Sequence, residues 1–354
     1  MSKVGLLTFH RTNNFGSYLQ AYGLYKAIVQ LGYDCEIIDY RSTSIEGREG
    51  LLKGQRERGL KSLAKRVLYG HRLKKKAFNL HKFFYKHTQF SPEYTHADIE
   101  NVEDRFDKIV VGSDLVWDTT ITNNDYTFML DFVKDCSKKV AFASSVGNIV
   151  ERDKDEKCKT LLMEFSRIAV RENDAKGWIE GFYQGQVDWV CDPTMLLDCR
   201  EWDALCSKPL KKKYVLVYFN SDNGKCLEDA KAYARKENCS AIMIGYGKKL
   251  KGVKTVAPTS LTEFLSLVKN AERVFTASYH GMLFSIYFNT PFLFYTRAQK
   301  SRVLSLANKL GVKECCGDKI DISNIPPIDY KQINQKVEKF REESLSVLAE
   351  MLKE

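Results

Sequence analysis

Short apolar runs alternate with helix-like stretches from the start of the chain. Residues 3–9 are almost continuously apolar, as expected of a parallel strand that is buried on both faces. A polar loop with one glycine follows at 10–17, and residues 18–31 then repeat apolar positions with helical spacing up to Gly32. The next strand is predicted at 36–40. This order predicts a β-α-β unit with a ligand-type loop, although neither the dinucleotide pattern GxGxxG nor a P-loop is present.

Further strands continue the pattern, and each ends in small or polar residues. They are predicted at 107–111, 138–143, 168–170 and 187–191. Because the carboxyl ends of parallel strands share one edge of a sheet, the polar strand ends are expected to line one wall of a site. Polar turns after strands are also ordinary, so each loop alone is a weak signal. We predict one Rossmann-like domain over residues 1–205.

A second series of strands and helices begins after the three lysines at 211–213. Its strands are predicted at 214–219, 240–244, 273–276 and 292–295, and its helices at 225–236, 261–269, 281–288 and 301–310. The alternation predicts a second Rossmann-like domain over 206–328, followed by a closing amphipathic helix within 329–354. The predicted fold class is therefore α/β, with two Rossmann-like parallel-sheet domains that face a cleft.

A basic segment interrupts the first domain at about residues 42–90. Between Glu46 and Lys86 it holds thirteen Lys or Arg and three Glu, an excess equal to the chain's net charge of +10. Apolar residues recur at roughly helical spacing over 59–69, which predicts a basic amphipathic helix. Such a helix suits an anionic polymer or an anionic membrane surface, which would be contacted by residues 46–87. A solvated helical insertion without a partner explains the pattern equally well. Nucleic acid is not a predicted partner, because the rest of the chain is nearly neutral and shows no reader motif.

Composition sets broader limits on the function. The 354 residues are 44% apolar and 28% charged, which is typical of a soluble chain with two domains. The ten cysteines include no CxxC pair, which favours reduced thiols in a cytoplasm over disulfides or a zinc site. No cluster has metal-ligand spacing, so no metal is predicted. The sequence shows neither a signal peptide nor an apolar run of about twenty residues, so neither secretion nor membrane spanning is expected.

The stretch 274–288 carries the most specific candidate chemistry. It is predicted as a short strand, a tight turn with His280 and Gly281, and a helix. The carboxyl edge of a strand, next to a helix N-terminus, is where anions bind in open α/β sheets. His280 could act there as a general base, a general acid or a phosphate ligand. A turn histidine that caps its helix is the alternative, and the surrounding pattern favours the functional interpretation.

Eight short motifs occur along the chain in a characteristic order. They are VGLLTFH (4–10), NNFG (13–16), LQAY (19–22), VGSDLVW (111–117), ASSVG (143–147), VRE (170–172), DPTMLL (192–197) and SYHG (278–281). Singly these motifs are weak, but in this order the set is specific. It resembles the polysaccharide pyruvyl transferase family over nearly the whole chain. The resemblance implies a fold like that of the two-Rossmann, GT-B-like glycosyltransferases.

The resemblance also implies a reaction. Characterised members of that family transfer the pyruvyl unit of phosphoenolpyruvate onto sugar hydroxyls, giving a pyruvate ketal on a cell-surface glycan. The implied donor is phosphoenolpyruvate, and no metal or other cofactor is required. In the characterised branch, an arginine precedes the motif histidine by two positions, and this chain has Ser278 there. Arg297 and Arg302, just beyond the next strand, could replace that contact.

The expected site residues follow from this chemistry. Proton transfer falls to His280, with Asp114 as the second candidate, for which a helix cap is the alternative. Arg171 is the first candidate for the donor's oxyanions, because a guanidinium can bind them with two hydrogen bonds; an ion pair with Glu172 is the alternative. The other donor-site candidates are Ser278, Tyr279, Gly281, Arg297 and Arg302. The acceptor-site candidates are Asn13, Asn14, Ser17, Ser113 and Ser144, although Asn13, Asn14 and Ser17 are equally ordinary as turn and cap residues.

Two other functions stay open at this point. One is a glycosyltransferase of the same architecture that uses a nucleotide sugar, and the other is a non-catalytic glycan-binding relative. The first would need a base-and-ribose pocket in the second domain, where no acidic ribose-binding pattern stands out. The non-catalytic alternative stays open because this chain has Ser278 where the characterised branch has an arginine. The expected location is cytoplasmic, with peripheral contact at the inner face of the membrane and a lipid-linked sugar as one form of the acceptor.

Overall fold

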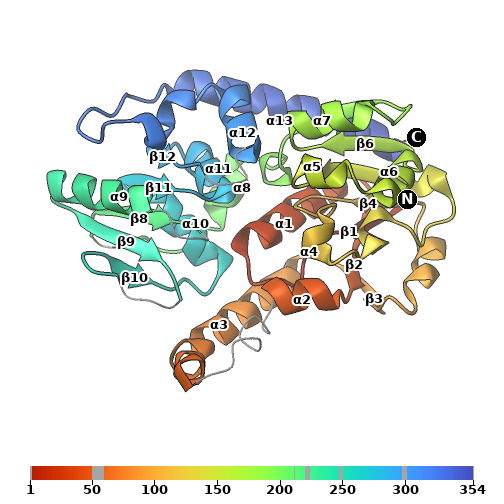
Figure 1. Ribbon diagram of the computed structural model, residues 1–354, viewed down its shortest axis with the longest axis horizontal. Helices are drawn as coiled ribbons and strands as arrows, with labels where there is room; N and C mark the ends of the chain where they lie inside the picture. Colours follow the sequence, from red (N-terminus) through yellow and green to blue (C-terminus); the bar gives the residue numbers. More distant parts are fainter. Residues whose placement is uncertain are drawn as a thin grey trace. The chain divides into compact units, whose positions relative to one another are not determined.

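The computed structural model describes residues 2–49, 60–210, 212–219, 224–246, 250–296 and 301–353 (Figure 1). The chain folds into two compact units. The first comprises Met1–Arg56, Leu80–Leu197 and Lys339–Glu354, and the second comprises Glu57–Asn79 and Asp198–Glu338. Each unit contains one parallel sheet with helices between its strands, which confirms the predicted α/β class with two Rossmann-like sheets.

In the first unit, seven strands of the described part pair in parallel in the order β3-β2-β1-β4-β5-β6-β7. Their bounds are β1 Lys3–Leu7, β2 Asp34–Tyr40, β3 Phe90–Tyr94, β4 Lys108–Val111, β5 Lys139–Ser144, β6 Arg167–Val170 and β7 Val187–Trp189. The central strands are buried along most of their length, which explains their unbroken apolar runs. The order reverses between β1 and β4, so the loops after these two strands diverge and leave a crevice at their carboxyl ends.

The first long helix of this unit begins at a polar cap. Helix α1 (Phe15–Gln30) starts after Asn14, whose side chain accepts a hydrogen bond from the N–H of Gly16 at 3.0 Å. This cap explains why the helix begins before residue 18, where apolar periodicity predicted its start. The other helices up to residue 197 are α2 Thr43–Glu49, α3 Leu60–His87, α4 Thr119–Thr122, α5 Ile149–Arg152, α6 Glu156–Met163 and α7 Asn173–Glu180, with 3-10 turns η1 Ile99–Arg105, η2 Tyr126–Met129, η3 Cys136–Lys138 and η4 Pro193–Met195.

In the second unit, five strands of the described part pair in parallel in the order β10-β9-β8-β11-β12. They are β8 Tyr214–Tyr218, β9 Ser240–Ile244, β10 Lys254–Val256, β11 Arg273–Thr276 and β12 Phe292–Phe294. The helical elements from residue 198 onward are α8 Cys199–Ala204, α9 Gly224–Lys236, α10 Leu261–Lys269, α11 Tyr279–Tyr287, α12 Ser301–Leu310, η5 Lys313–Cys315, η6 Gly317–Lys319 and α13 Tyr330–Lys353. The order reverses between β8 and β11, so this sheet has its own crevice at their carboxyl ends.

Two strands were missed by the sequence analysis, and both lie at the edge of a sheet. An edge strand has only one paired neighbour, so it needs no continuous apolar run. Strand β3 even contains Pro92, whose missing N–H is tolerated where no further strand has to be paired. Strand β10 is only three residues long and begins with an exposed lysine. Neither segment therefore carries the pattern of a buried strand.

The division of the chain differs from the predicted limits in two places. Residues 57–79, expected in the first domain, group with the second unit, where Asn79 hydrogen-bonds Thr259 at 3.3 Å. The closing helix α13 is shared, with its residues up to Glu338 in the second unit and those from Lys339 in the first. Within the described ranges, no helix is both long and apolar enough to span a lipid bilayer.

Candidate functional site

The loops after β1 and β4 lie on either side of the crevice of the first sheet, and a side-chain hydrogen bond joins α1 to the loop after β4. Ser17, in the first turn of α1, donates a hydrogen bond from Oγ to Oδ2 of Asp114 at 2.6 Å. Asp114 has a left-handed φ of 70°, which is uncommon for a residue other than glycine. Its Oδ1 accepts the N–H of Leu115 at 3.0 Å, and its carbonyl accepts the N–H of Ser145 at 3.1 Å. The structure thus brings together one predicted proton-transfer group and one predicted acceptor residue.

The other acceptor candidates have structural roles in this edge of the sheet. Ser113 and Ser144 are fully buried. Oγ of Ser144 donates to the carbonyl of Val111 at 3.1 Å, and the N–H of Ser113 donates to the side chain of Gln20 at 3.4 Å. These bonds hold β4, β5 and α1 together. Asn14 caps α1, as described above, and Asn13 is half-buried in the same loop.

Arg171 lies in a buried ionic cluster that follows β6. Its side chain is 1% exposed, and a terminal guanidinium nitrogen lies 2.6 Å from Oδ2 of the fully buried Asp192. Nε lies 3.3 Å from Oε1 of Glu172, and the second terminal nitrogen donates to Oγ of Ser145 at 2.8 Å. We call these four residues the Arg171 cluster. Two carboxylates surround one guanidinium, which supports the ion-pair alternative for Arg171 and extends it to a second partner, Asp192.

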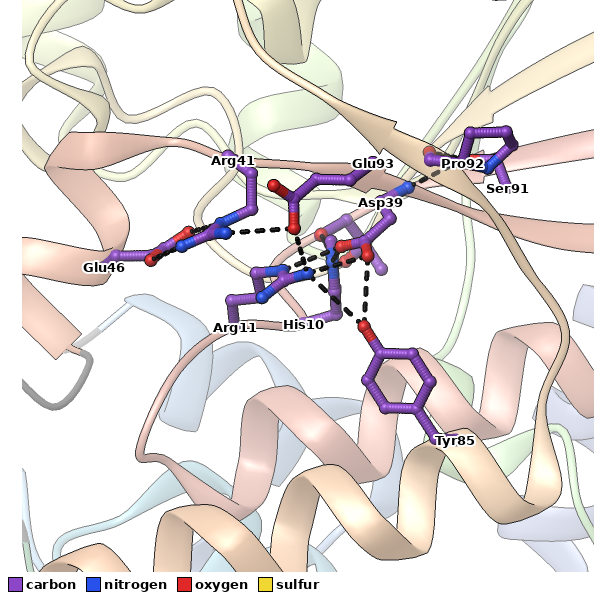
Figure 2. A network of polar contacts seen from close by, with 10 residues as sticks. His10, Arg11, Asp39, Arg41, Glu46, Tyr85, Ser91, Pro92 and Glu93 are labelled. Atoms are coloured by element: carbon purple, nitrogen blue, oxygen red, sulfur yellow. Dashed lines mark hydrogen bonds and ion pairs between the residues drawn. The ribbon is translucent and has the colours of Figure 1, made fainter.

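A second polar network, which the sequence analysis missed, lies at the carboxyl ends of β1 and β2 (Figure 2). Nε2 of His10 lies 2.9 Å from Oδ1 of Asp39, and Nδ1 lies 3.0 Å from the carbonyl oxygen of Thr8. A carboxylate and a carbonyl only accept hydrogen bonds, so each contact is a hydrogen bond in which the ring nitrogen donates. Arg11 adds a bidentate pair to Asp39, with both distances 2.7 Å.

The charge of Asp39 is stabilised by these neighbours. Burial acts to raise the pKa of Asp39, but hydrogen bonds from His10 and Arg11, together with their positive charges, hold it well below its usual range. The hydroxyl of Tyr85 also donates to Asp39, at 3.0 Å. Around this centre, Arg41 pairs with Glu46 and Glu93. We call the whole set the Asp39 network: His10, Arg11, Asp39, Arg41, Glu46, Tyr85 and Glu93 (Figure 2).

The sequence contained one signal for the Asp39 network. Asp39 directly follows the apolar pair Ile37 and Ile38 in the buried half of β2, and a buried carboxylate in a strand needs a cation or donors near it. The side chain of His10 is almost completely buried, so it supports the loop from inside. A small hollow opens beside the network, lined by Thr8, Phe9, His10, Arg11, Tyr40, Ser42, Ile45, Glu46 and Phe128.

In the second unit, the motif 278–281 lies at the crevice between β8 and β11. Ser278 is the N-cap of α11, and the helix begins at Tyr279. His280 therefore lies in the first turn of the helix, which corrects the predicted start of this helix at Gly281. Its ring is in edge-on contact with Tyr279, with ring centroids 5.3 Å apart, and the residue is 9% exposed. The positive end of the dipole of α11 lies at this turn.

Close packing against β8 and β11 fixes the position of this turn. The N–H of Ser278 donates to Oγ1 of Thr276 at 3.0 Å, and that hydroxyl donates to the carbonyl of Tyr218 at 2.6 Å. Burial raises the pKa of Tyr218 to about 12, and a hydrogen bond with the side chain of Ser278 opposes this shift. A Cβ atom at Gly281 would lie 2.9 Å from the ring of Tyr218, so only glycine allows the helix to approach this closely.

Arg297 and Arg302 were the two arginines expected to replace the donor contact that is missing at Ser278. Arg297 lies outside the described residues. Arg302 is half-buried in the first turn of α12. Among the residues that the structure describes, no three His, Cys, Asp or Glu side chains gather closely enough to hold a metal ion.

Each of the two crevices offers one group that can transfer a proton. The first unit offers a carboxylate, Asp114, that already accepts a hydrogen bond from a hydroxyl group. A carboxylate can take a proton from such a hydroxyl when the hydroxyl becomes a nucleophile. The second unit offers an imidazole, His280, at a helix N-terminus that favours anions. An imidazole can give or accept a proton near neutral pH.

Comparison with known proteins adds a family and a fold. The family described as polysaccharide pyruvyl transferase matches residues 14–298 of the chain. A comparison with curated proteins gave no significant match.

Solved structures of similar fold include UDP-GlcNAc 2-epimerases and an alpha-glucosyltransferase. UDP-GlcNAc 2-epimerase from Methanocaldococcus jannaschii is 14% identical, with a TM-score of 0.52 and coverage of 96% of this chain and 92% of that one. UDP-GlcNAc 2-epimerase from Neisseria meningitidis bound to UDP-GlcNAc is 9% identical, with a TM-score of 0.51 and 99% of both chains covered. An alpha-glucosyltransferase in complex with UDP is 8% identical, with a TM-score of 0.51 and coverage of 98% and 95%. At these identities the likeness shows the fold alone, and it confirms the predicted GT-B-like class.

Proposed function

We propose that this chain, which belongs to the polysaccharide pyruvyl transferase family of transferases, moves the pyruvyl group of phosphoenolpyruvate onto sugar hydroxyls during cell-surface glycan biosynthesis. The observation that carries the proposal is the position of His280 in the first turn of α11, at the crevice of the second sheet. A helix N-terminus beside an imidazole suits a small anion that must be protonated during the reaction. Phosphoenolpyruvate, with a phosphate and a carboxylate on three carbons, is such an anion.

In the proposed reaction, an acceptor hydroxyl adds to C2 of phosphoenolpyruvate while His280 gives a proton to the methylene carbon C3. The proton of the hydroxyl passes to a base. A second hydroxyl of the same sugar then forms the second C2–O bond as the C2–O bond to phosphate breaks. The phosphate leaves with the proton of that hydroxyl, and the pyruvyl carboxylate stays on the ketal.

The donor would be held by the N-terminal turn of α11, with Ser278, Tyr279 and Gly281, and by Arg302. Ser278 stands where the resembled pattern has an arginine, so this chain would rely more on backbone N–H groups and on cations elsewhere. We propose that Arg171 is held as a structural cation instead, because its charge is matched by Asp192 and Glu172.

The test is thermal stabilisation by phosphoenolpyruvate, with UDP and GDP as comparison ligands. A ligand at about 100 times its Kd stabilises the native state by about 2.7 kcal/mol. Each kcal/mol raises the Tm of a unit of this size by roughly 2–4 °C. We expect a shift of several degrees with phosphoenolpyruvate. The matched activity measurement is phosphate release from phosphoenolpyruvate with a panel of hexose and N-acetylhexosamine glycosides as acceptors.

His280→Asn separates binding from chemistry in these two measurements. It is expected to keep most of the thermal shift and to lose phosphate release by at least 100-fold, the usual contribution of a general acid. The control is His71→Asn, which changes an exposed histidine on α3. Full phosphate release by His280→Asn would exclude the proposed proton transfer.

A second candidate function is transfer or epimerisation of a nucleotide sugar. It is favoured by the folds of UDP-GlcNAc 2-epimerase bound to UDP-GlcNAc and of the alpha-glucosyltransferase in complex with UDP. A thermal shift with UDP and none with phosphoenolpyruvate would replace the first proposal with this one. Glycan binding without turnover of any donor would instead indicate a non-catalytic relative.

A further inference from the structure

Helix α3 carries a high positive charge and no acidic residue. Its 28 residues, Leu60–His87, include nine Lys or Arg and neither Asp nor Glu. Side-chain burial is described from residue 70 onward, and over that part the helix has two faces of different character.

One face of α3 packs against the protein. Ala77, Leu80 and Phe84 recur at helical spacing and are buried. Lys76 is buried as well, and its ammonium group lies 4.6 Å from the centre of the Tyr246 ring. The aliphatic stem and the cation of this lysine therefore belong to the packed face. These contacts hold the helix in place and decide which side of it meets the solvent.

The opposite face of α3 is basic and has a phenyl ring in its middle. Lys74, Lys75 and Lys82 are exposed on the same side of the helix as Phe78, because steps of three, four and seven residues return to one face. Phe78 is 66% exposed. With no carboxylate on the helix, these charges have no partner from their own element.

We infer that this face rests on the surface of a membrane that contains anionic phospholipid. Lipid phosphates attract exposed lysines, and the boundary of the acyl chains accepts an aromatic side chain. A soluble polyanion would bind the lysines but would leave Phe78 in water, so the combination favours a membrane. The inference does not depend on the proposed reaction. If both hold, the helix brings the enzyme to the surface where lipid-linked sugars are found.

The experiment is sedimentation of the whole protein with lipid vesicles. Mixed vesicles of phosphatidylglycerol and phosphatidylcholine are expected to bind the protein, and pure phosphatidylcholine vesicles are expected to bind it weakly. Binding to the mixed vesicles should fall as salt is added, because salt screens the exposed charges. The triple variant Lys74→Gln, Lys75→Gln, Lys82→Gln should bind about 100-fold less tightly, since each lysine near such a surface contributes about fivefold.

Two further variants make the test specific to this face. Phe78→Ala should weaken binding about tenfold, because it removes the apolar anchor and no charge. The matched control replaces three exposed lysines elsewhere by glutamine, Lys313, Lys319 and Lys331, and so makes the same change in net charge. This control should bind vesicles like the unchanged protein. The Tm of each variant verifies that it is folded.

The inference would be overturned by equal losses in the control and in the α3 triple variant, because binding would then follow net charge alone. It would also be overturned if heparin bound as tightly as the mixed vesicles and Phe78→Ala left both affinities unchanged. That outcome would identify a soluble anionic polymer as the partner.

Discussion

Replacing Arg171 with methionine is expected to lower the free energy of unfolding of the first unit by about 3–5 kcal/mol. The arginine is 1% exposed, and its 2.6 Å partner Asp192 is fully buried. At an effective dielectric constant of about 20, the attraction at that distance is about 6 kcal/mol, and the desolvation of both ions offsets part of it. Methionine has a similar volume but leaves two carboxylates, those of Asp192 and Glu172, without a counter-charge.

The charge of Asp192, which Arg171→Met leaves without a partner cation, can be removed by a second substitution. Asp192→Asn keeps a side-chain oxygen for the N–H of Thr194, which bonds Asp192 at 3.0 Å in the native protein. The double variant Arg171→Met, Asp192→Asn should therefore be more stable than Arg171→Met alone by about 1–3 kcal/mol. Urea denaturation followed by tryptophan fluorescence measures both, and Trp189 reports locally, because its Nε1 donates to the carbonyl of Arg171 at 3.1 Å.

A surface arginine provides the control. Arg200 is 87% exposed and pairs with Asp198, so Arg200→Met should change stability by less than about 1 kcal/mol. A loss of under about 1 kcal/mol in Arg171→Met, together with loss of the thermal shift by phosphoenolpyruvate, would refute the structural role. It would return Arg171 to the donor site, as the sequence first indicated. A double variant no more stable than the single one would refute the ion-pair reasoning on its own.

Three further predictions concern the second unit and the pH dependence. Gly281→Ala should cost about 1–3 kcal/mol and abolish the shift by phosphoenolpyruvate, because the added methyl has no room beside β11. Burial lowers the pKa of His81 from 6.5 to about 4. As the pH falls, the unfolded chain therefore binds a proton at this histidine before the folded protein does, and the folded state loses stability. His81→Gln should reduce the loss of stability between about pH 6.5 and pH 4. The pKa of Asp39 is depressed, so its ionised carboxylate contributes to the free energy of unfolding above about pH 4, and this contribution is lost as the carboxylate is protonated. Asp39→Asn should therefore make the fall of the unfolding free energy below that pH less steep.

Each of these predictions is measured by the urea midpoint and has a contrasting outcome. Gly177→Ala, in open space on α7, should stabilise by about 0.5–1 kcal/mol; equal effects at Gly281 and Gly177 would contradict the packing argument. His71→Gln, at an exposed histidine, should leave the pH profile unchanged, and a profile unchanged by His81→Gln would contradict the burial of His81. If the unfolding free energy of Asp39→Asn falls as steeply at low pH as that of the unchanged protein, protonation of Asp39 is not the cause of the fall.

Local pattern was sufficient to locate most of the elements of both sheets. The predicted segments 240–244, 261–269, 273–276 and 301–310 agree with the observed bounds, and the closing helix α13, Tyr330–Lys353, lies within the predicted 329–354. A parallel strand buried on both faces must be apolar throughout, and an amphipathic helix repeats its apolar positions every three or four residues. Both signals are complete within about ten residues, so no distant part of the chain has to be known.

The local sequence pattern did not predict which polar side chains contact one another. Ser17 and Asp114 are 97 positions apart, and Arg171 and Asp192 are 21 apart. The sequence placed all four at strand ends, but strand order and register decide which of them meet. Asp39 was overlooked because its partner His10, 29 positions away, belongs to a neighbouring strand's loop.

The sequence by itself therefore determined the two α/β sheets, the family resemblance and the motif around His280, since each depends on residue types at short, fixed spacing. Only the tertiary structure decided that Arg171 is enclosed by two carboxylates and that Ser17 holds Asp114. It also decided which face of α3 is packed and which is exposed. The physical reason is that burial and charge pairing depend on contacts between distant segments, and these contacts exist only once the strands have taken their order in the sheet.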